Sequence, residues 1–148
     1  MGTNRPKIDL LAEHQVVEEL ADQLMCAAGR SAAVHPAEWI EEVRSRFAAF
    51  RTHFIEHMSM EERDGYFADL ARRAPQYAVE IDRLYGEHRD FAMIMELIRD
   101  LIERIQPDDR LLIRDCKRRI ADLMAYLDRH EKDEDLIIMA VRRKDQSS

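Results

Sequence analysis

Two histidine–glutamate pairs in this chain have the same spacing. His57 precedes Glu61 by four residues, and His130 precedes Glu134 by four. On a helix, residues four apart lie one turn apart on the same face, so each pair presents an imidazole and a carboxylate to one space. Both groups bind metal ions, and a buried carboxylate without partners destabilises a fold. The two pairs therefore suggest a metal site between helices.

The elements that must position these pairs are long, because the 148 residues include only four Gly and four Pro. Such a composition disfavours a sheet with many hairpins. Breaks fall at Gly29, Pro36, Pro75 and Pro107, since proline cannot continue a helix but fits the first turn of a new one. We expect four helices over about residues 8 to 29, 36 to 73, 76 to 105 and 108 to 143.

An apolar stripe recurs along each expected helix in alternating steps of three and four, which is the pattern of one buried face. Short connections favour antiparallel neighbours, so we predict an all-α, up-down-up-down antiparallel four-helix bundle. The polar residues that interrupt the stripes, and that we expect to face inward, are His14, His57, Glu61, His88, His130 and Glu134.

In this topology we expect three of these polar residues at a similar height along the bundle axis. With a rise of about 1.5 Å per residue, Glu61 lies ~18 Å before the end of its helix and His88 ~18 Å after the start of its own. Glu134 lies ~14 Å before the end of the fourth helix, whereas His14 lies only ~9 Å from the start of the first. His14 therefore fits the common level less well.

Four imidazoles and two carboxylates suit iron, manganese or zinc, and they are too many for one tetrahedral ion. We expect two metal ions that share both carboxylates. Three further residues are possible ligands. His53 lies on the flank of the stripe one turn before His57, while Tyr126 and Tyr85 precede His130 and His88. Each tyrosine could donate a hydrogen bond near the metal or bind it as phenolate, and core packing is the alternative.

Composition points to one domain over residues 1–148, with 46% hydrophobic residues and a net charge of −7 at pH 7. Both signs of charge are interleaved, which argues against nucleic acid as a partner. The longest apolar run, from Leu136 to Val141, is far shorter than a membrane span, and we expect no membrane association. Two cysteines without a C-x-x-C motif favour a cytoplasmic protein. Asp9 and Glu13 favour it as well, because they interrupt the first apolar stretch and a signal peptide would not contain them there.

The pattern resembles the haemerythrin-like (HHE cation-binding) family, whose motif is H…HxxxE…H…HxxxE. The matching pieces are Glu13-His14, His57 to Glu62 followed by Tyr66-Phe67, Glu87 to Arg89, and His130 to Glu134. The resemblance implies two iron ions, bridged by an oxo or hydroxo group, with manganese or zinc as alternatives. A ferritin-like oxidase is excluded because no Glu-x-x-His occurs in the chain.

The family resemblance also implies a small-molecule ligand: dioxygen, nitric oxide, peroxide or iron itself. Oxygen-carrying relatives have a fifth histidine four residues from the third one, whereas here Leu84 and Ala92 flank His88 at that spacing. This departure argues against stable oxygen carriage. Three hypotheses stay open: a binding or sensing protein, a diiron enzyme with peroxidase/catalase-like or nitric oxide reducing activity, and a structural metal-stabilised bundle. No protein partner can be named.

Overall fold

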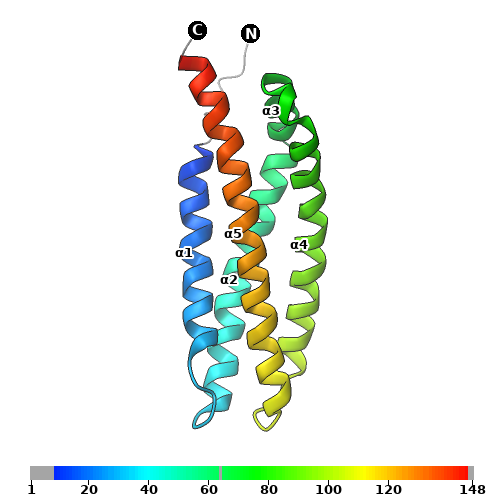
Figure 1. Cartoon of the computed structure of the whole chain (residues 1–148). Helices are drawn as coiled ribbons and strands as arrows, with labels where there is room; N and C mark the ends of the chain where they lie inside the picture. The colour runs from blue at the N-terminus through cyan, green and yellow to red at the C-terminus, as the bar shows by residue number, and fades with distance from the viewer. Residues whose placement is uncertain (1–8, 64, 147–148) are drawn as a thin grey trace.

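The computed structural model describes residues 9–63 and 65–146, and this part of the chain is helical without any strand. The prediction of an all-α fold is confirmed. Figure 1 shows long helices side by side, with a short one at the end where both termini lie. The helices are α1 (Leu10–Gly29), α2 (Pro36–Arg63), α3 (Tyr66–Arg73), α4 (Ala78–Arg104) and α5 (Arg110–Gln146), with a 3-10 turn at Pro75–Tyr77.

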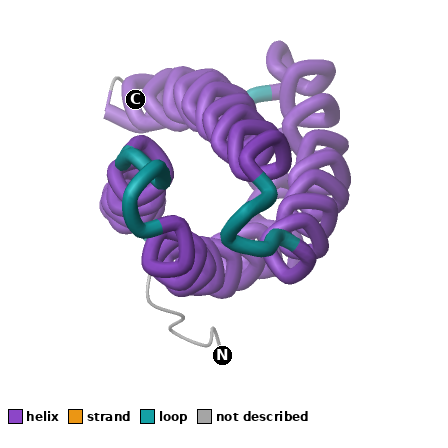
Figure 2. The backbone as a smooth tube through the Cα atoms, turned by 90° about the horizontal axis from the view of Figure 1, so that it is seen from below, coloured by secondary structure: helices purple, strands orange, loops and turns teal. Residues whose placement is uncertain are grey.

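Each long helix of the described chain packs against two others. Helix α1 contacts α2 and α5, and α4 contacts the same two helices. The end-on view of Figure 2 shows these helices around a common axis. The connections from α1 to α2 and from α4 to α5 lie together at the end opposite α3 (Figure 1). A polar side chain on any of these inner faces can therefore meet side chains from the other helices.

The single helix predicted over residues 36–73 is wrong, because α2 ends at Arg63 and α3 begins at Tyr66. Gly65 lies between them with a φ of 68°. This left-handed conformation is costly for residues with a Cβ and easy for glycine, and it cannot continue an α-helix. The chain turns there, and α3 packs against α2, α4 and α5.

Because α2 ends early, the predicted distance of Glu61 from the end of its helix is also wrong. Glu61 stands two residues before the end of α2, or about 3 Å along the axis rather than ~18 Å. His14 likewise lies near the start of α1, four residues after Leu10. Both residues therefore lie toward the α3 end of the bundle. The start of α1 predicted at residue 8 is outside the described residues, and α5 extends to Gln146, beyond the predicted 143.

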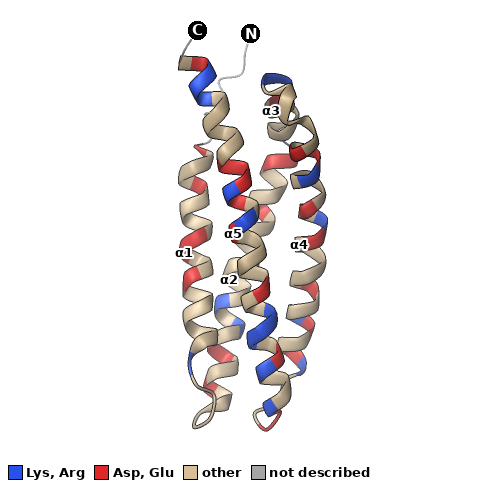
Figure 3. Cartoon of the chain, viewed as in Figure 1, with Lys and Arg blue, Asp and Glu red and all other residues tan. Residues whose placement is uncertain are grey.

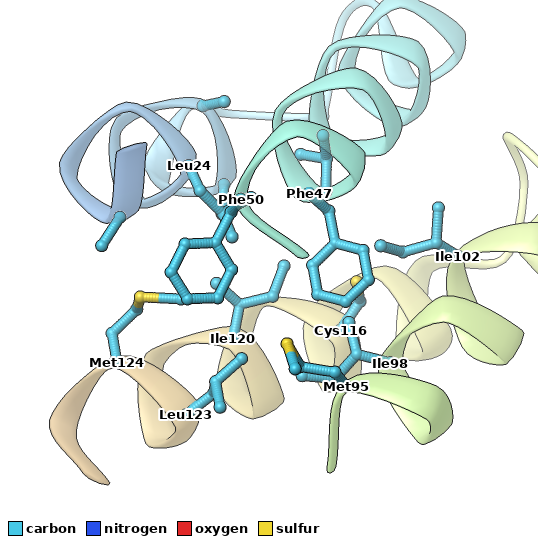
Figure 4. Packing of buried hydrophobic residues seen from close by; sticks show 14 of the residues in the cluster. Leu24, Phe47, Phe50, Met95, Ile98, Ile102, Cys116, Ile120, Leu123 and Met124 are labelled. Atoms are coloured by element: carbon cyan, nitrogen blue, oxygen red, sulfur yellow. The ribbon is translucent and has the colours of Figure 1, made fainter. Parts of the chain in front are cut away.

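The larger of the two hydrophobic clusters fills the bundle from the loop end up to Phe54, Met58, Phe91 and Leu127. Figure 4 shows Phe50 among Leu24, Ile120 and Met124, which come from α1 and α5.

A smaller cluster lies at the α3 end, where Phe67 and Leu70 pack with residues of α4 and α5 such as Leu84 and Ile137. The two clusters are separate. Buried histidine and glutamate side chains on α1, α2, α4 and α5 occupy the level between them.

Charged residues of both signs are interleaved along the helices, as Figure 3 shows most clearly for α5. Ion pairs one turn apart on a helix, such as Arg46 with Glu42 and Lys132 with Asp128, are part of this pattern. None of the helices in the described residues has the length and apolar character needed to cross a bilayer.

We expect Phe50→Ala to destabilise the protein by about 3–5 kcal/mol, because it removes a fully buried ring and leaves a cavity. Urea unfolding followed by circular dichroism measures this cost. Leu111→Ala is the matched control, since Leu111 is 77% exposed and its truncation should change stability little. Equal losses in both variants would contradict the packing described for the larger cluster.

Candidate metal centre

The six residues singled out in the sequence are all buried at the level between the two hydrophobic clusters, and no residue among them is more than 4% exposed. They come from four different helices. Helix α1 contributes one histidine and α4 another, whereas α2 and α5 each contribute a histidine and the glutamate one turn later. The residues are His14, His57, Glu61, His88, His130 and Glu134.

Glu134 is completely buried, and its two oxygens face different histidines. Oε1 lies 3.4 Å from Nε2 of His14, and Oε2 lies 3.3 Å from Nε2 of His130. The carboxylate therefore extends between imidazoles of α1 and α5. A carboxylate in this position can bind one ion through each oxygen.

Glu61 has a similar place on the other side of the centre. Its Oε1 lies 3.0 Å from Nε2 of His57 and 3.5 Å from Nε2 of His88. The rings of His14 and His57 are 5.2 Å apart, and those of His88 and His130 are 5.4 Å apart. The imidazoles thus form two pairs, and each pair has an oxygen of both glutamates beside it.

Ligand atoms of His14, His57, Glu61 and Glu134 lie within 4.8 Å of one another. Both oxygens of each glutamate are buried without a hydrogen-bond partner, as are the Nε2 atoms of His14 and His88. Two donors that each stand about 2.1 Å from an ion, at a right angle, are about 3 Å apart. The separations in this cluster are close to that value, so the donor set fits metal ions.

The additional ligands considered from the sequence lie elsewhere. Nε2 of His53 is 2.6 Å from Oε1 of Glu13, and the side chain is partly exposed. The hydroxyl of Tyr126 donates to Asp90, at 3.1 Å. Tyr85 is half exposed and stacks beside His88 with ring centroids 6.3 Å apart. The structure does not bring these three residues together with the six.

Helix α3 adds two aromatic residues whose place the sequence did not indicate. Phe67 packs on His88 with ring centroids 5.1 Å apart, and it belongs to the smaller hydrophobic cluster. Burial and the nearby charges of Glu134 and Glu61 raise the pKa of Tyr66 well above its usual value. Both side chains lie just after the Asp64-Gly65 dipeptide, a common turn signal that could have indicated a separate helix.

Acidic residues around the centre raise the pKa of the His14 imidazole in the metal-free protein. Burial alone would lower the pKa of His14, but Glu134, with Glu131 and Asp135, outweighs burial and raises this pKa from 6.5 to about 9. Burial alone would raise the pKa of Glu61, but its neighbours, including His57, outweigh burial and hold this pKa well below its usual range. Without metal, a positive imidazole partly balances the two glutamates.

We expect the metal-free protein to lose stability as the pH rises from about 6.5 to 9. The folded pKa of His14 lies above its unfolded value. Its stabilising contribution is therefore complete below pH 6.5 and disappears as the pH passes about 9. Glu131 acts in the same direction, because burial raises its pKa to about 8.

Urea unfolding in the presence of a chelator, at several pH values, measures this dependence. His14→Gln should flatten the profile above pH 6.5. A metal-free wild-type protein that gains stability over this range would contradict the expected charge balance.

The sequence matches the family described as hemerythrin HHE cation binding domain over residues 8–141. Neither the curated proteins nor the solved structures gave a match to this chain. The matched range includes the six buried residues of the cluster and covers most of the 148 residues. The chain therefore belongs to the hemerythrin HHE cation-binding family of metal-binding helical domains.

Proposed function

We propose that this chain is a non-haem diiron protein. One iron would be held by His14 and His57 and the other by His88 and His130, with Glu61 and Glu134 shared between them. The observation that carries the proposal is the position of Glu134, whose two oxygens face imidazoles of different pairs at 3.4 and 3.3 Å. A mixed set of imidazole and carboxylate donors suits iron.

The proposal includes one domain over residues 1–148 with an up-down-up-down antiparallel arrangement of α1, α2, α4 and α5. The short connections at the end opposite α3 support this topology (Figure 1). The contacts of α1 and α4 with the same two neighbours support it as well. Such a bundle holds the ligands on rigid elements, which a precise metal centre requires.

The function that we propose is the binding or sensing of a small ligand such as dioxygen, nitric oxide, peroxide or iron. Bound iron would supply a redox-active Lewis acid with room for an exogenous ligand. The protein supplies the surroundings: Phe54 and Phe91 pack against the imidazoles of His57 and His130 from one side. Phe67 covers His88 from the other side. These rings cover part of the centre, which would favour small ligands over large ones.

An enzyme acting on peroxide or nitric oxide is the second candidate. A groove of about 740 Å³ between α2 and α4 is lined by Glu62, His88 and Ala92, among others. Ala92 is one of the two neighbours of His88, with Leu84, at the spacing of four residues that separates the third and fifth histidines of oxygen carriers in the family. A smaller residue there, beside an open groove, favours access of a reactant to the His88 side of the centre.

Metal analysis of the purified protein is the first test. About two irons per chain support the diiron proposal. One zinc per chain supports a structural metal-stabilised bundle, and either one zinc or no metal overturns the diiron proposal. Visible spectra of the reduced protein with dioxygen or nitric oxide then test ligand binding. Unchanged spectra would refute the binding function.

Turnover assays separate the two candidates. Steady turnover of peroxide or nitric oxide that is lost in His130→Ala favours the enzyme. A reaction that stops after one equivalent favours binding or sensing.

A further inference from the structure

Each helix that contributes to the centre also has an acidic residue directly beside one of the six residues in the sequence. These acids do not face the inside of the cluster. They lie outside it, against the second ring nitrogen of the histidines. We call them the outer carboxylates: Glu13 beside His14, Glu62 beside Glu61, Glu87 beside His88, and Asp135 beside Glu134.

Each outer carboxylate contacts a histidine of the neighbouring helix rather than of its own. Nδ1 of His14 is 2.7 Å from Asp135, on α5, and Nδ1 of His88 is 3.0 Å from Glu62, on α2. Nδ1 of His130 is 2.8 Å from Glu87, on α4.

The fourth contact is longer and completes the circle. Glu13, on α1, lies 3.8 Å from Nδ1 of His57, on α2, because it also contacts His53 at 2.6 Å. The contacts thus run from α1 to α2, to α4, to α5 and back to α1, in the order in which the helices surround the axis (Figure 2). The ring has three hydrogen bonds and one longer ion-pair contact.

These contacts determine which ring nitrogen of the imidazole carries the proton and which one faces the centre. An ionised carboxylate only accepts hydrogen bonds, so Nδ1 must carry the proton that it donates. In a neutral imidazole, the lone pair is then on Nε2, which is the atom that faces the buried glutamates in His14, His57, His88 and His130. The outer carboxylates therefore present the metal-binding nitrogen of His14, His88 and His130 to the centre, whereas Nδ1 of His57 makes only the longer contact with Glu13.

Glu87 is the most firmly held outer carboxylate. Only 8% of the residue is exposed, and its second oxygen accepts a hydrogen bond of 2.9 Å from Arg83. Arg83 also donates to Asp133 on α5, at 3.0 Å. Glu62 is more accessible, because it lies in the groove between α2 and α4. Glu87 is therefore the best place to test what an outer carboxylate does.

We propose that the outer carboxylates are positioning residues of the diiron centre, which orient the imidazoles and stabilise iron in its more oxidised, more highly charged state. The inference rests on the diiron function proposed above. A negative charge hydrogen-bonded to a ligating imidazole makes it a stronger donor. Buried negative charge favours the ferric over the ferrous ion by the same Coulomb attraction.

Glu87→Gln in the iron-loaded protein tests the proposal, because it keeps the size of the side chain and one acceptor oxygen for Nδ1 of His130 while it removes the charge. The second oxygen, which accepts from Arg83, is replaced by an amide NH2 group. We expect the preference for ferric iron to fall about tenfold, a rise of about 59 mV in a one-electron reduction potential. We also expect weaker binding of zinc, by about 10- to 100-fold. Zinc has no redox chemistry, so its affinity reports on the orientation of the imidazoles without any change of oxidation state.

Asp128→Asn is the matched control. It removes one negative charge two residues before His130, from an exposed side chain that pairs with Lys132. A raised potential in Glu87→Gln and an unchanged one in Asp128→Asn are the expected results. Equal potentials in wild type and Glu87→Gln, with two irons in both, would overturn the inference. A wild-type protein that does not bind two irons would instead refute the proposed function.

Glu62→Gln gives a second test if Glu87→Gln folds poorly. Its side chain is more accessible and contacts His88 in the same way. The same rise in potential is expected, and its absence would overturn the inference for this position.

Discussion

Replacing Glu134 by alanine is expected to reduce the bound iron from about two per chain to fewer than one. The side chain is completely buried, and its two oxygens face His14 and His130 from the two histidine pairs. The substitution therefore removes a ligand from both ions at once, and it leaves the imidazoles around an empty space. Metal analysis of protein loaded with excess ferrous iron measures the change.

Two further variants test whether the loss of iron is specific to the shared carboxylate of Glu134. His14→Ala removes a donor from one pair, so we expect it to affect one ion more than the other. Asp122→Asn, an exposed position on the same helix as Glu134, should retain the full metal content. If Glu134→Ala kept two irons with unchanged affinity, the sharing of this carboxylate between the ions would be wrong.

Removing the metal should lower the melting temperature by about 10 °C. Saturation at 1,000 times the dissociation constant stabilises a protein by about 4 kcal/mol, and each kcal/mol shifts the melting point of a domain of this size by about 2–4 °C. The four oxygens of Glu61 and Glu134, which are buried without a hydrogen-bond partner, are the reason to expect so large an effect, because their burial is only partly balanced by a positive imidazole when no ion is present.

Scanning calorimetry of iron-loaded and chelated protein measures this shift. A control with Glu134→Ala should melt at the same temperature with and without metal. Identical melting of the loaded and chelated wild-type protein would contradict a role for the metal in holding the helices together.

The inner residues of the centre could be predicted because they interrupt regular apolar stripes. His57 and Glu61 fall where the stripe through Phe50 and Phe54 demands apolar residues, so their burial follows from the helical period alone. The end of α2 is not predicted in this way, because the stripe identifies the buried face of a helix and not the residue at which the helix ends. Backbone conformation, rather than hydrophobic pattern, ends that helix.

The contacts of the outer carboxylates could not be predicted from the sequence, for a different reason. Glu87 and Asp135 lie directly beside His88 and Glu134 in the sequence, but this position does not indicate that their partner is a histidine of another helix. The rotation of each helix about its own axis decides whether such a residue meets an imidazole or water. Only the packed structure gives that rotation. The placement of Tyr85 and Tyr126 away from the centre depends on the same information.

The polar level that separates the two hydrophobic clusters has a consequence for the way the protein unfolds. Phe67, Leu70 and Leu84 belong to a small hydrophobic cluster that is separate from the larger one. Parts of a protein with few buried apolar contacts can open locally without unfolding of the rest. In the chelated protein, the α3 end should open as an independent unit while the larger cluster stays closed. Iron would join the two units, so that backbone amides of α3 exchange their hydrogens only when the whole bundle opens.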